Sequence, residues 1–202
     1  MYRAFSLSYA SHFHAIIFRM SQFQDRTKQA LLVIDVQVNV VADAWKRDEV
    51  IANINTLVTK SRQRNTPVIW VQHSDEGMEI GTDGWQIVSE LVPLLAEPVI
   101  RKRYRSSFEE TELEETLSKL GIGHLVICGA ETDNCVRHTS HAALERGYDV
   151  TLIEDAHTTS DGPSDSGTLF ASAIIEEQNR SFLNYELPGR TASITTTAEV
   201  AF

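Results

Sequence analysis

The chain has 202 residues, of which 42% are hydrophobic and 23% charged, as is ordinary for a soluble globular protein with one domain. Its formal net charge of −10 argues against a nucleic-acid partner, because such binding depends on clustered lysine and arginine side chains. No apolar run approaches the roughly 20 residues that cross a bilayer, so we expect no membrane association.

Residues 1–28 are predicted to form an N-terminal extension, followed by one domain over residues 29–202. The first 24 residues contain two arginines and no acid, which is compatible with a weak organelle-targeting peptide. Met20 begins a segment that runs directly into the first predicted strand. We therefore favour the interpretation that residues 1–19 are an extension, an upstream start or a flexible arm and not a targeting peptide.

Apolar runs of strand length alternate with amphipathic segments along the rest of the chain. The runs are rich in branched residues, as in strands that are buried on both faces of a sheet. Strands are predicted at residues 30–36, 68–73, 98–102, 124–130, 148–156 and within 192–200. Helices are predicted at residues 49–64 behind Asp48 as N-cap, 85–95, 107–120, 134–146 and 166–183, with a short terminal helix after the last strand.

The order of these elements predicts a parallel sheet, because a helical crossover joins parallel neighbours. Four or more such units without sequence repeats indicate a single-domain α/β fold. The expected fold is a doubly wound, mostly parallel sheet with helices on both faces, in a Rossmann-like three-layer arrangement. Ligands bind such sheets beyond the carboxyl ends of the strands. The candidate site residues near predicted strand ends are Asp35, His73, Lys102 and residues 129–135.

Cys128 and Cys135 are the only cysteines, too few for a disulfide framework, and this favours a reducing, cytoplasmic location. Cys135 follows a predicted strand and lies near the start of a predicted helix. Unpaired amides and the helix dipole at such a position stabilise a thiolate, and a nearby ammonium group lowers the pKa of the thiol further. Cys135 is therefore the candidate nucleophile, whereas Cys128, inside the apolar run LVICG, is expected to be buried and inert.

Three motifs occur in a specific order along the chain. ALLVIDVQ surrounds Asp35, KRYRSSF begins at Lys102, and CGAETDNCVRHTSHAALERGYDVTLIEDA begins at Cys128. Together they resemble the isochorismatase-like cysteine hydrolase superfamily, which includes nicotinamidases and N-carbamoylsarcosine amidohydrolase, over most of the chain from about Ala30. The resemblance implies a cysteine amidohydrolase with a catalytic triad of Cys135, Asp35 and Lys102, and relatives commonly form homo-oligomers.

The resemblance also implies a cis peptide bond between Ala130 and Glu131, which would aim the backbone amides of Glu131 and Cys135 at one oxyanion. In the implied chemistry the thiolate attacks a carbonyl carbon, Asp35 carries the thiol proton to the leaving amine, and Lys102 keeps Asp35 ionised. We therefore expect hydrolysis of an amide, carbamoyl or ureido C–N bond in a small molecule, through a thioester and without a cofactor.

Two of these candidates also have a simpler interpretation. An aspartate after a buried strand is often only a turn or cap residue, and this reading applies to Asp35. Lys102 lies among arginines that fit a solvated basic patch, but only Lys102 stands four residues before Ser106 in the K-x-x-x-S-x-F pattern of the superfamily. Alternate residues of a strand face opposite sides, so Lys102 can point inward while its neighbours point elsewhere. One of those arginines is a candidate for binding an anionic substrate group.

No metal site is predicted. Nicotinamidases of the superfamily build one on an Asp-x-His unit with further histidines, whereas here His73 precedes Asp75 with no additional ligand nearby. His138 and His141 could share one face of a predicted helix, but two histidines alone usually lie on the surface.

Candidate pocket residues are those expected close to the triad. They are Gln37, Val40, Trp45, His73, Trp85 and Tyr104. Val40 stands where relatives commonly carry Phe, and Glu131 where they often carry an apolar residue, so the resemblance does not identify the substrate. The Glu131 side chain fits two roles: it binds an amine or urea nitrogen, or it faces solvent.

Other functions fit the same fold. Vinyl ether hydrolysis of the isochorismatase type proceeds by acid catalysis and does not need a cysteine, so the presence of Cys135 favours the amidohydrolase. A catalytically silent member of the fold is disfavoured because all three triad residues are present. A nucleotide-binding protein is weaker still, since no G-x-G-x-x-G or P-loop follows a predicted strand.

Overall fold

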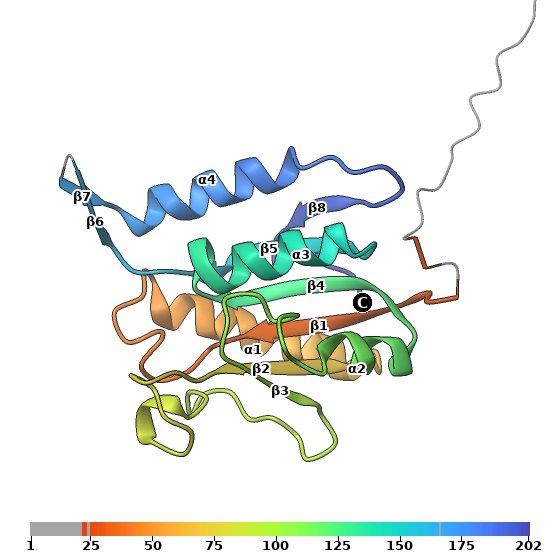
Figure 1. Cartoon of the computed structure of the whole chain (residues 1–202), viewed down its shortest axis with the longest axis horizontal. Coiled ribbons are helices and arrows are strands. Elements are labelled where there is room, and N and C mark those ends of the chain that lie inside the picture. The colour runs from red at the N-terminus through yellow and green to blue at the C-terminus, as the bar shows by residue number, and fades with distance from the viewer. Residues whose placement is uncertain (1–21, 24, 166) are drawn as a thin grey trace, which may run out of the picture.

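A six-stranded parallel sheet forms the centre of the computed structural model, which describes residues 22–23, 25–165 and 167–202 (Figure 1). The strands lie in the order β3-β2-β1-β4-β5-β8, and every neighbouring pair is parallel. Their bounds are Lys28–Ile34 for β1, Val68–His73 for β2, Val99–Lys102 for β3, Ile122–Ala130 for β4, Asp149–Thr158 for β5 and Ala192–Thr195 for β8. The predicted α/β fold with a mostly parallel sheet is confirmed.

The predicted extension over residues 1–28 falls mostly outside the described part of the chain. Its described end packs against the domain, where Arg26 Nη1 donates hydrogen bonds to Tyr148 Oη and Glu114 Oε1. Strand β1 begins at Lys28. The division of the chain at this point stays a prediction.

Helices cover both faces of the sheet, with α1 behind it and α2 and α3 in front in Figure 1. Their bounds are Arg47–Gln63 for α1, Leu113–Leu120 for α2, Arg137–Glu145 for α3 and Ala171–Leu183 for α4. Leu32 and Ile34 of β1 join a core with α2, α3 and α4, whereas Leu31 and Val33 join a second core with α1. Successive residues of a strand point to opposite faces, so the sheet is apolar on both. Within the described residues, no helix has the length and apolar composition that crossing a bilayer requires.

Two predicted helices begin later than expected. The helix predicted at 107–120 is α2, which starts at Leu113, and the one predicted at 166–183 is α4, which starts at Ala171. A hairpin of β6 (Gly162–Ser164) and β7 (Gly167–Leu169) precedes α4. Gly167 has a φ of 132°, which a helix does not allow.

The helix predicted at 85–95 is absent. Only a 3₁₀ turn, Asp83–Trp85, lies there. Pro93 disfavours helical conformation in the residue before it, and Val88 and Leu91 pack into the core beside α1 instead.

Two further local expectations also change. Helix α1 begins at Arg47, so the predicted cap Asp48 lies in its first turn, where a carboxylate still interacts favourably with the helix dipole. Among the described residues after β8 there is no terminal helix; Glu199 N donates a hydrogen bond to Thr196 O in a turn.

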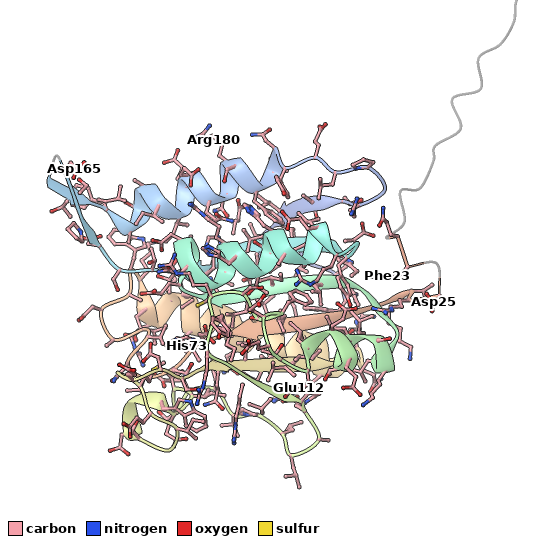
Figure 2. The ribbon with its side chains drawn as sticks, viewed as in Figure 1. Phe23, Asp25, His73, Glu112, Asp165 and Arg180 are labelled. Carbon is pink, nitrogen blue, oxygen red and sulfur yellow. The ribbon has the colours of Figure 1, made fainter. Side chains whose placement is uncertain are left out.

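Residues at the carboxyl ends of neighbouring strands come together at one edge of the sheet. Asp35 follows β1, while His73 ends β2 and Lys102 ends β3 as direct partners in register. Figure 2 shows His73 at this edge. Gly129 of β4 runs so close to β1 that any side chain there would overlap the Ile34 backbone. Glycine therefore permits the close approach of the two strands that lead to Asp35 and to the turn beyond β4.

Candidate active site

Asp35, Lys102 and Cys135 meet at the carboxyl edge of the sheet. Lys102 Nζ lies 2.6 Å from Asp35 Oδ2 and 3.1 Å from Cys135 Sγ. The Lys102 side chain is 0% exposed and that of Asp35 is 1% exposed. A buried charge is costly unless it is paired, so the ammonium and carboxylate groups stabilise one another. The structure thus brings together the three side chains selected from the sequence.

The backbone holds Asp35 in a rare conformation. Its φ is 49°, in the left-handed region that few residues other than Gly, Asn and Asp adopt. Asp35 N donates a hydrogen bond of 3.0 Å to Val71 O, so β2 holds this turn in place. Such strain persists only where the surrounding structure enforces it, and it is frequent at functional sites.

Cys135 lies in a single π-helical turn, Thr132–Val136, that leads into α3. Val136 N donates a hydrogen bond of 3.1 Å to Glu131 O, five residues back. The predicted helix therefore begins with a wider turn, a form that often occurs at functional sites. The peptide bond between Ala130 and Glu131 is cis. The role of the Glu131 and Cys135 amides as an oxyanion hole stays a prediction.

A buried histidine of β5 contacts this π-helical turn through the side chain of Thr132. His157 Nδ1 lies 2.9 Å from Thr132 Oγ1, and His157 Nε2 lies 2.8 Å from Asn179 Oδ1 of α4. Burial lowers the pKa of His157 to about 4, so the ring is neutral at pH 7. Because an amide oxygen only accepts, Nε2 carries the proton and Nδ1 accepts from the threonine hydroxyl. Sequence analysis missed His157. Its position directly after a predicted buried strand could have identified it.

Burial is the largest single influence on the pKa of each of the three candidate catalytic groups, although for Lys102 the other influences together outweigh it. It raises the pKa of Cys135 to about 12, together with the nearby Asp35 carboxylate and against the influence of Lys102. Burial also raises the pKa of Asp35, against the attraction of Lys102. It acts to lower the pKa of Lys102, but Asp35 and Cys135 raise it above its ordinary value. The expected low pKa of Cys135 is therefore wrong, and the resting residue is a thiol that needs a base.

The candidate nucleophile opens into a cavity of about 490 Å³. Cys135 and Asp35 form part of its wall, and of the predicted pocket residues Val40 and His73 line it. Other polar residues on the wall, besides Glu131, are Asn39, Asp43, Asp75, Arg105, Asn134 and Ser160. Asn134 belongs to the candidate segment 129–135, and Arg105 is one of the arginines considered for an anionic substrate group, whereas sequence analysis did not assign the other four to the pocket. Most lie in loops after strands, where no periodicity marks a side chain as facing a cavity.

Two predicted pocket residues are buried in the protein instead. Gln37 pairs with Ile87 in an isolated bridge, and its side chain turns inward. There Gln37 Nε2 donates to His73 O at 3.0 Å, and Gln37 Oε1 accepts from His73 N at 2.7 Å. Trp85 is buried, with the Arg101 guanidinium over its ring. Both residues support the wall without lining it.

Two other predicted pocket residues lie outside this cavity, with their rings about half exposed. Trp45 N donates to Thr159 O at 2.9 Å, which holds the Trp45 backbone at the rim. Tyr104 turns its carbonyl oxygen toward Lys102 Nζ, at 3.2 Å, and the residue lines a neighbouring surface hollow. Nearness to the triad along the chain therefore did not predict the direction of these side chains.

Among the described residues, no three His, Cys, Asp or Glu side chains are placed to hold a metal ion. His73 Nε2 lies 3.1 Å from Asp75 Oδ2. His138 Nδ1 lies 2.8 Å from Asn134 O, and the His141 ring stacks on aromatic rings of α4 and the segment after it. His73 and His138 thus each have a ring nitrogen paired with another group of the protein, and the His141 ring is held by stacking.

Comparison with known proteins places this site in a family. The model of the family described as Isochorismatase domain matches residues 29–178. The chain is 34% identical over 149 residues to streptothricin hydrolase of Streptomyces noursei, a match that covers 70% of this chain and 59% of that protein. The chain therefore spans less than two thirds of this relative.

Solved structures share the fold over most of their length. An isochorismatase from Pseudomonas putida has a TM-score of 0.78 at 30% identity, covering 86% of this chain and 90% of that chain. The N-carbamoylsarcosine amidase from Thermoplasma acidophilum has a TM-score of 0.69 at 25% identity, covering 86% of this chain and 98% of that chain. With the family model matched across most of the sequence, the chain belongs to the isochorismatase family of hydrolases.

Proposed function

We propose that this chain is a cysteine hydrolase that cleaves an amide, carbamoyl or ureido C–N bond of a small molecule. The observation that carries the proposal is the contact of one buried ammonium group, Lys102 Nζ, with both Asp35 and Cys135 beside a cavity. Relatives named as a hydrolase and as an amidase support it.

In the first step the Asp35 carboxylate takes the thiol proton of Cys135 while the sulfur attacks the carbonyl carbon. A base is required because the raised pKa of Cys135 leaves the thiol protonated at neutral pH. The raised pKa of Asp35 makes its carboxylate a stronger base for this proton. The carbonyl π electrons move to oxygen. As they return, the C–N bond breaks, Asp35 gives its proton to the leaving nitrogen, and a thioester remains on Cys135.

Water completes the cycle by attacking the thioester carbonyl carbon. Asp35 accepts a proton from that water, the C–S bond breaks, and the sulfur regains the proton. One water is consumed, and an amine or ammonia and an acid are released. Throughout, the Lys102 ammonium stays beside the carboxylate and the sulfur, where it stabilises negative charge on either. These steps need only groups of the protein and water.

Charged side chains on the cavity wall bear on the choice of substrate. Asp43 and Glu131 present carboxylates, and Arg105 presents a cation. Glu131 Oε2 accepts a hydrogen bond of 2.9 Å from Asn134 Nδ2, which fixes the Glu131 side chain along the wall. We expect a substrate with cationic or N–H groups near the two carboxylates, and with an anionic group only where it reaches Arg105.

Hydrolysis of a vinyl ether is the second candidate, and the raised pKa of Asp35 favours it. Acid catalysis requires a carboxyl group that holds its proton closer to neutral pH, and Asp35 is shifted in that direction. Since this reaction needs no nucleophile, Cys135 separates the two candidates.

An ammonia-release screen tests the proposal. Wild type, Cys135→Ala and the matched control Cys128→Ala are compared over nicotinamide, carbamoyl amino acids, ureidoacrylate, biuret and simple amides. Release by wild type and Cys128→Ala, with loss in Cys135→Ala, is the expected result. Turnover that survives in Cys135→Ala contradicts nucleophilic catalysis. We further propose that the chain forms a homo-oligomer, which light scattering tests. We also propose a cytoplasmic location, which cell fractionation tests.

A further inference from the structure

Four acceptor atoms surround the Lys102 ammonium group, which has only three protons to donate. They are Asp35 Oδ2 at 2.6 Å, Cys135 Sγ at 3.1 Å, His73 Nδ1 at 3.2 Å and Tyr104 O at 3.2 Å. The three hydrogen bonds of Lys102 Nζ run to Cys135 Sγ, His73 Nδ1 and Tyr104 O, while its contact with the Asp35 carboxylate is an ion pair. The direction of the ammonium group therefore depends on His73.

This contact determines which nitrogen of His73 carries a proton. An ammonium group only donates, so His73 Nδ1 accepts from Lys102 and the ring proton lies on Nε2. Nε2 in turn donates to Asp75 Oδ2 at 3.1 Å. Asp75 Oδ1 accepts from Gly77 N at 2.9 Å, which holds the carboxylate in place. Asp75, His73 and Lys102 thus form one directed chain of hydrogen bonds.

The backbone of His73 is held as firmly as its ring. The buried Gln37 amide bonds both His73 N and His73 O, and β2 and β3 set His73 directly beside Lys102 in register. The ring is therefore placed by the sheet, by Gln37 and by Asp75. A residue that only walls a cavity would not need this support.

We propose that His73 is a positioning residue that orients the Lys102 ammonium group between Asp35 and Cys135, and that Asp75 fixes the His73 tautomer this role requires. When Cys135 loses its proton, the Lys102 N–H group that already points at Sγ stabilises the thiolate, and the hydrogen bond to His73 Nδ1 keeps the ammonium group in this direction. The consequence for catalysis rests on the proposed function, but the effect on the reactivity of the Cys135 thiol does not.

Two substitutions of His73 separate positioning from packing. In His73→Asn the amide oxygen can occupy the place of Nδ1 and still accept from Lys102. In His73→Gln the amide reaches the place of Nε2, so it keeps Asp75 as a partner and loses the acceptor for Lys102. Asp75→Asn leaves the ring in place but can donate to Nε2, which favours the tautomer with a proton pointing at Lys102. Glu76→Gln is the matched control, because it removes the neighbouring exposed carboxylate.

The test is the rate at which iodoacetamide alkylates Cys135 at pH 8 in the full chain, followed by mass spectrometry. We expect His73→Gln to slow alkylation about tenfold, equivalent to a rise of about one unit in the pKa of Cys135, and His73→Asn to stay within about threefold of wild type. Asp75→Asn should slow it by about threefold or more, and Glu76→Gln should leave it unchanged.

Equal rates in His73→Asn and His73→Gln would overturn the positioning role, and a wild-type rate in Asp75→Asn would overturn the role of the tautomer. Thermal unfolding checks each variant, and Asp75→Asn, at an exposed side chain, keeps the test open where a His73 variant does not fold. Alkylation needs no substrate, so a failed ammonia-release screen does not affect this result. With a substrate in hand, Asp75→Asn should lower kcat about tenfold at little-changed KM.

Discussion

Cys128 and Cys135 belong to the same strand and the turn beyond it, yet their surroundings differ. Cys128 lies in the apolar core of β4, where its thiol contacts Leu32 O at 3.8 Å. Cys135 lies past the end of β4 beside Asp35 and Lys102, with a cavity in front of it. Burial raises the pKa of both thiols. A low pKa therefore does not distinguish the reactive cysteine; a base within reach and an open approach do.

Removing each sulfur in turn gives the largest expected contrast. Cys135→Ala should lower the rate of amide hydrolysis by about 10⁴-fold or more, because the nucleophile is lost. Cys128→Ala should leave kcat nearly unchanged and lower the free energy of unfolding by about 1–2 kcal/mol through a small cavity in the core. Steady-state kinetics and urea unfolding of both variants measure this. Similar activity in the two variants would remove the distinction.

Removing the base should be the next largest change. Asp35→Asn leaves the Lys102 ammonium group buried without its carboxylate, so we expect a loss of about 10²–10⁴-fold in activity. The free energy of unfolding should fall by about 3–5 kcal/mol. Adding Lys102→Met should restore part of that stability and none of the activity. A double variant no more stable than Asp35→Asn would show that the two charges are not coupled.

The pH dependence of alkylation sharpens the comparison further. With a Cys135 pKa of about 12, the thiolate fraction should rise about tenfold per unit between pH 7 and 10, and the rate with iodoacetamide should follow. Cys128 should react more slowly at every pH because it is wholly buried. Peptide mapping by mass spectrometry separates the two sites. A rate that levels off near pH 8 would instead indicate a lowered pKa at Cys135.

The stability of the folded chain should also fall in acid because of His157, and this is the smallest effect that we expect. Its pKa lies near 4 in the folded chain against 6.5 as the ordinary value, so between these pH values only the unfolded chain binds the proton. The contribution is fully present above pH 6.5 and is lost as the pH falls toward 4. Between pH 6.5 and pH 5 the loss in the free energy of unfolding from this group should amount to about 2 kcal/mol.

His157→Gln removes this titration while it keeps a donor toward Asn179. Urea unfolding of wild type and variant at pH 7 and pH 5 gives the comparison, and the variant should lose less stability on acidification. Parallel losses in both proteins would show that His157 does not bind the proton differentially.

Strands and triad residues could be predicted because local patterns mark them. The strand predicted at 68–73 is β2, Val68–His73. A short apolar run of branched residues that directly follows a helix is typical of a buried parallel strand. Lys102 could be singled out because the motif spacing to Ser106 separates it from the neighbouring arginines. Where chain order alone determines position at the sheet edge, the prediction holds.

Side-chain direction in loops and protonation could not be predicted. Gln37 follows Asp35 closely but turns inward, because a bridge to Ile87 sets its direction. Tyr104 offers Lys102 a carbonyl oxygen instead of a ring. The strand-to-helix junction suggested a lowered pKa for Cys135, yet burial and a carboxylate from a distant strand raise it. Each of these outcomes depends on contacts between segments far apart in the sequence.

A covalent adduct on Cys135 tests the central claim most directly. The Cys128→Ala variant, which keeps a single cysteine, is mixed with a substrate from the screen, quenched in acid within the first turnovers and examined by mass spectrometry. The account predicts an acyl group on Cys135 that decays as the acid product appears. Full turnover in Cys135→Ala, without an adduct in the Cys128→Ala protein, would contradict it.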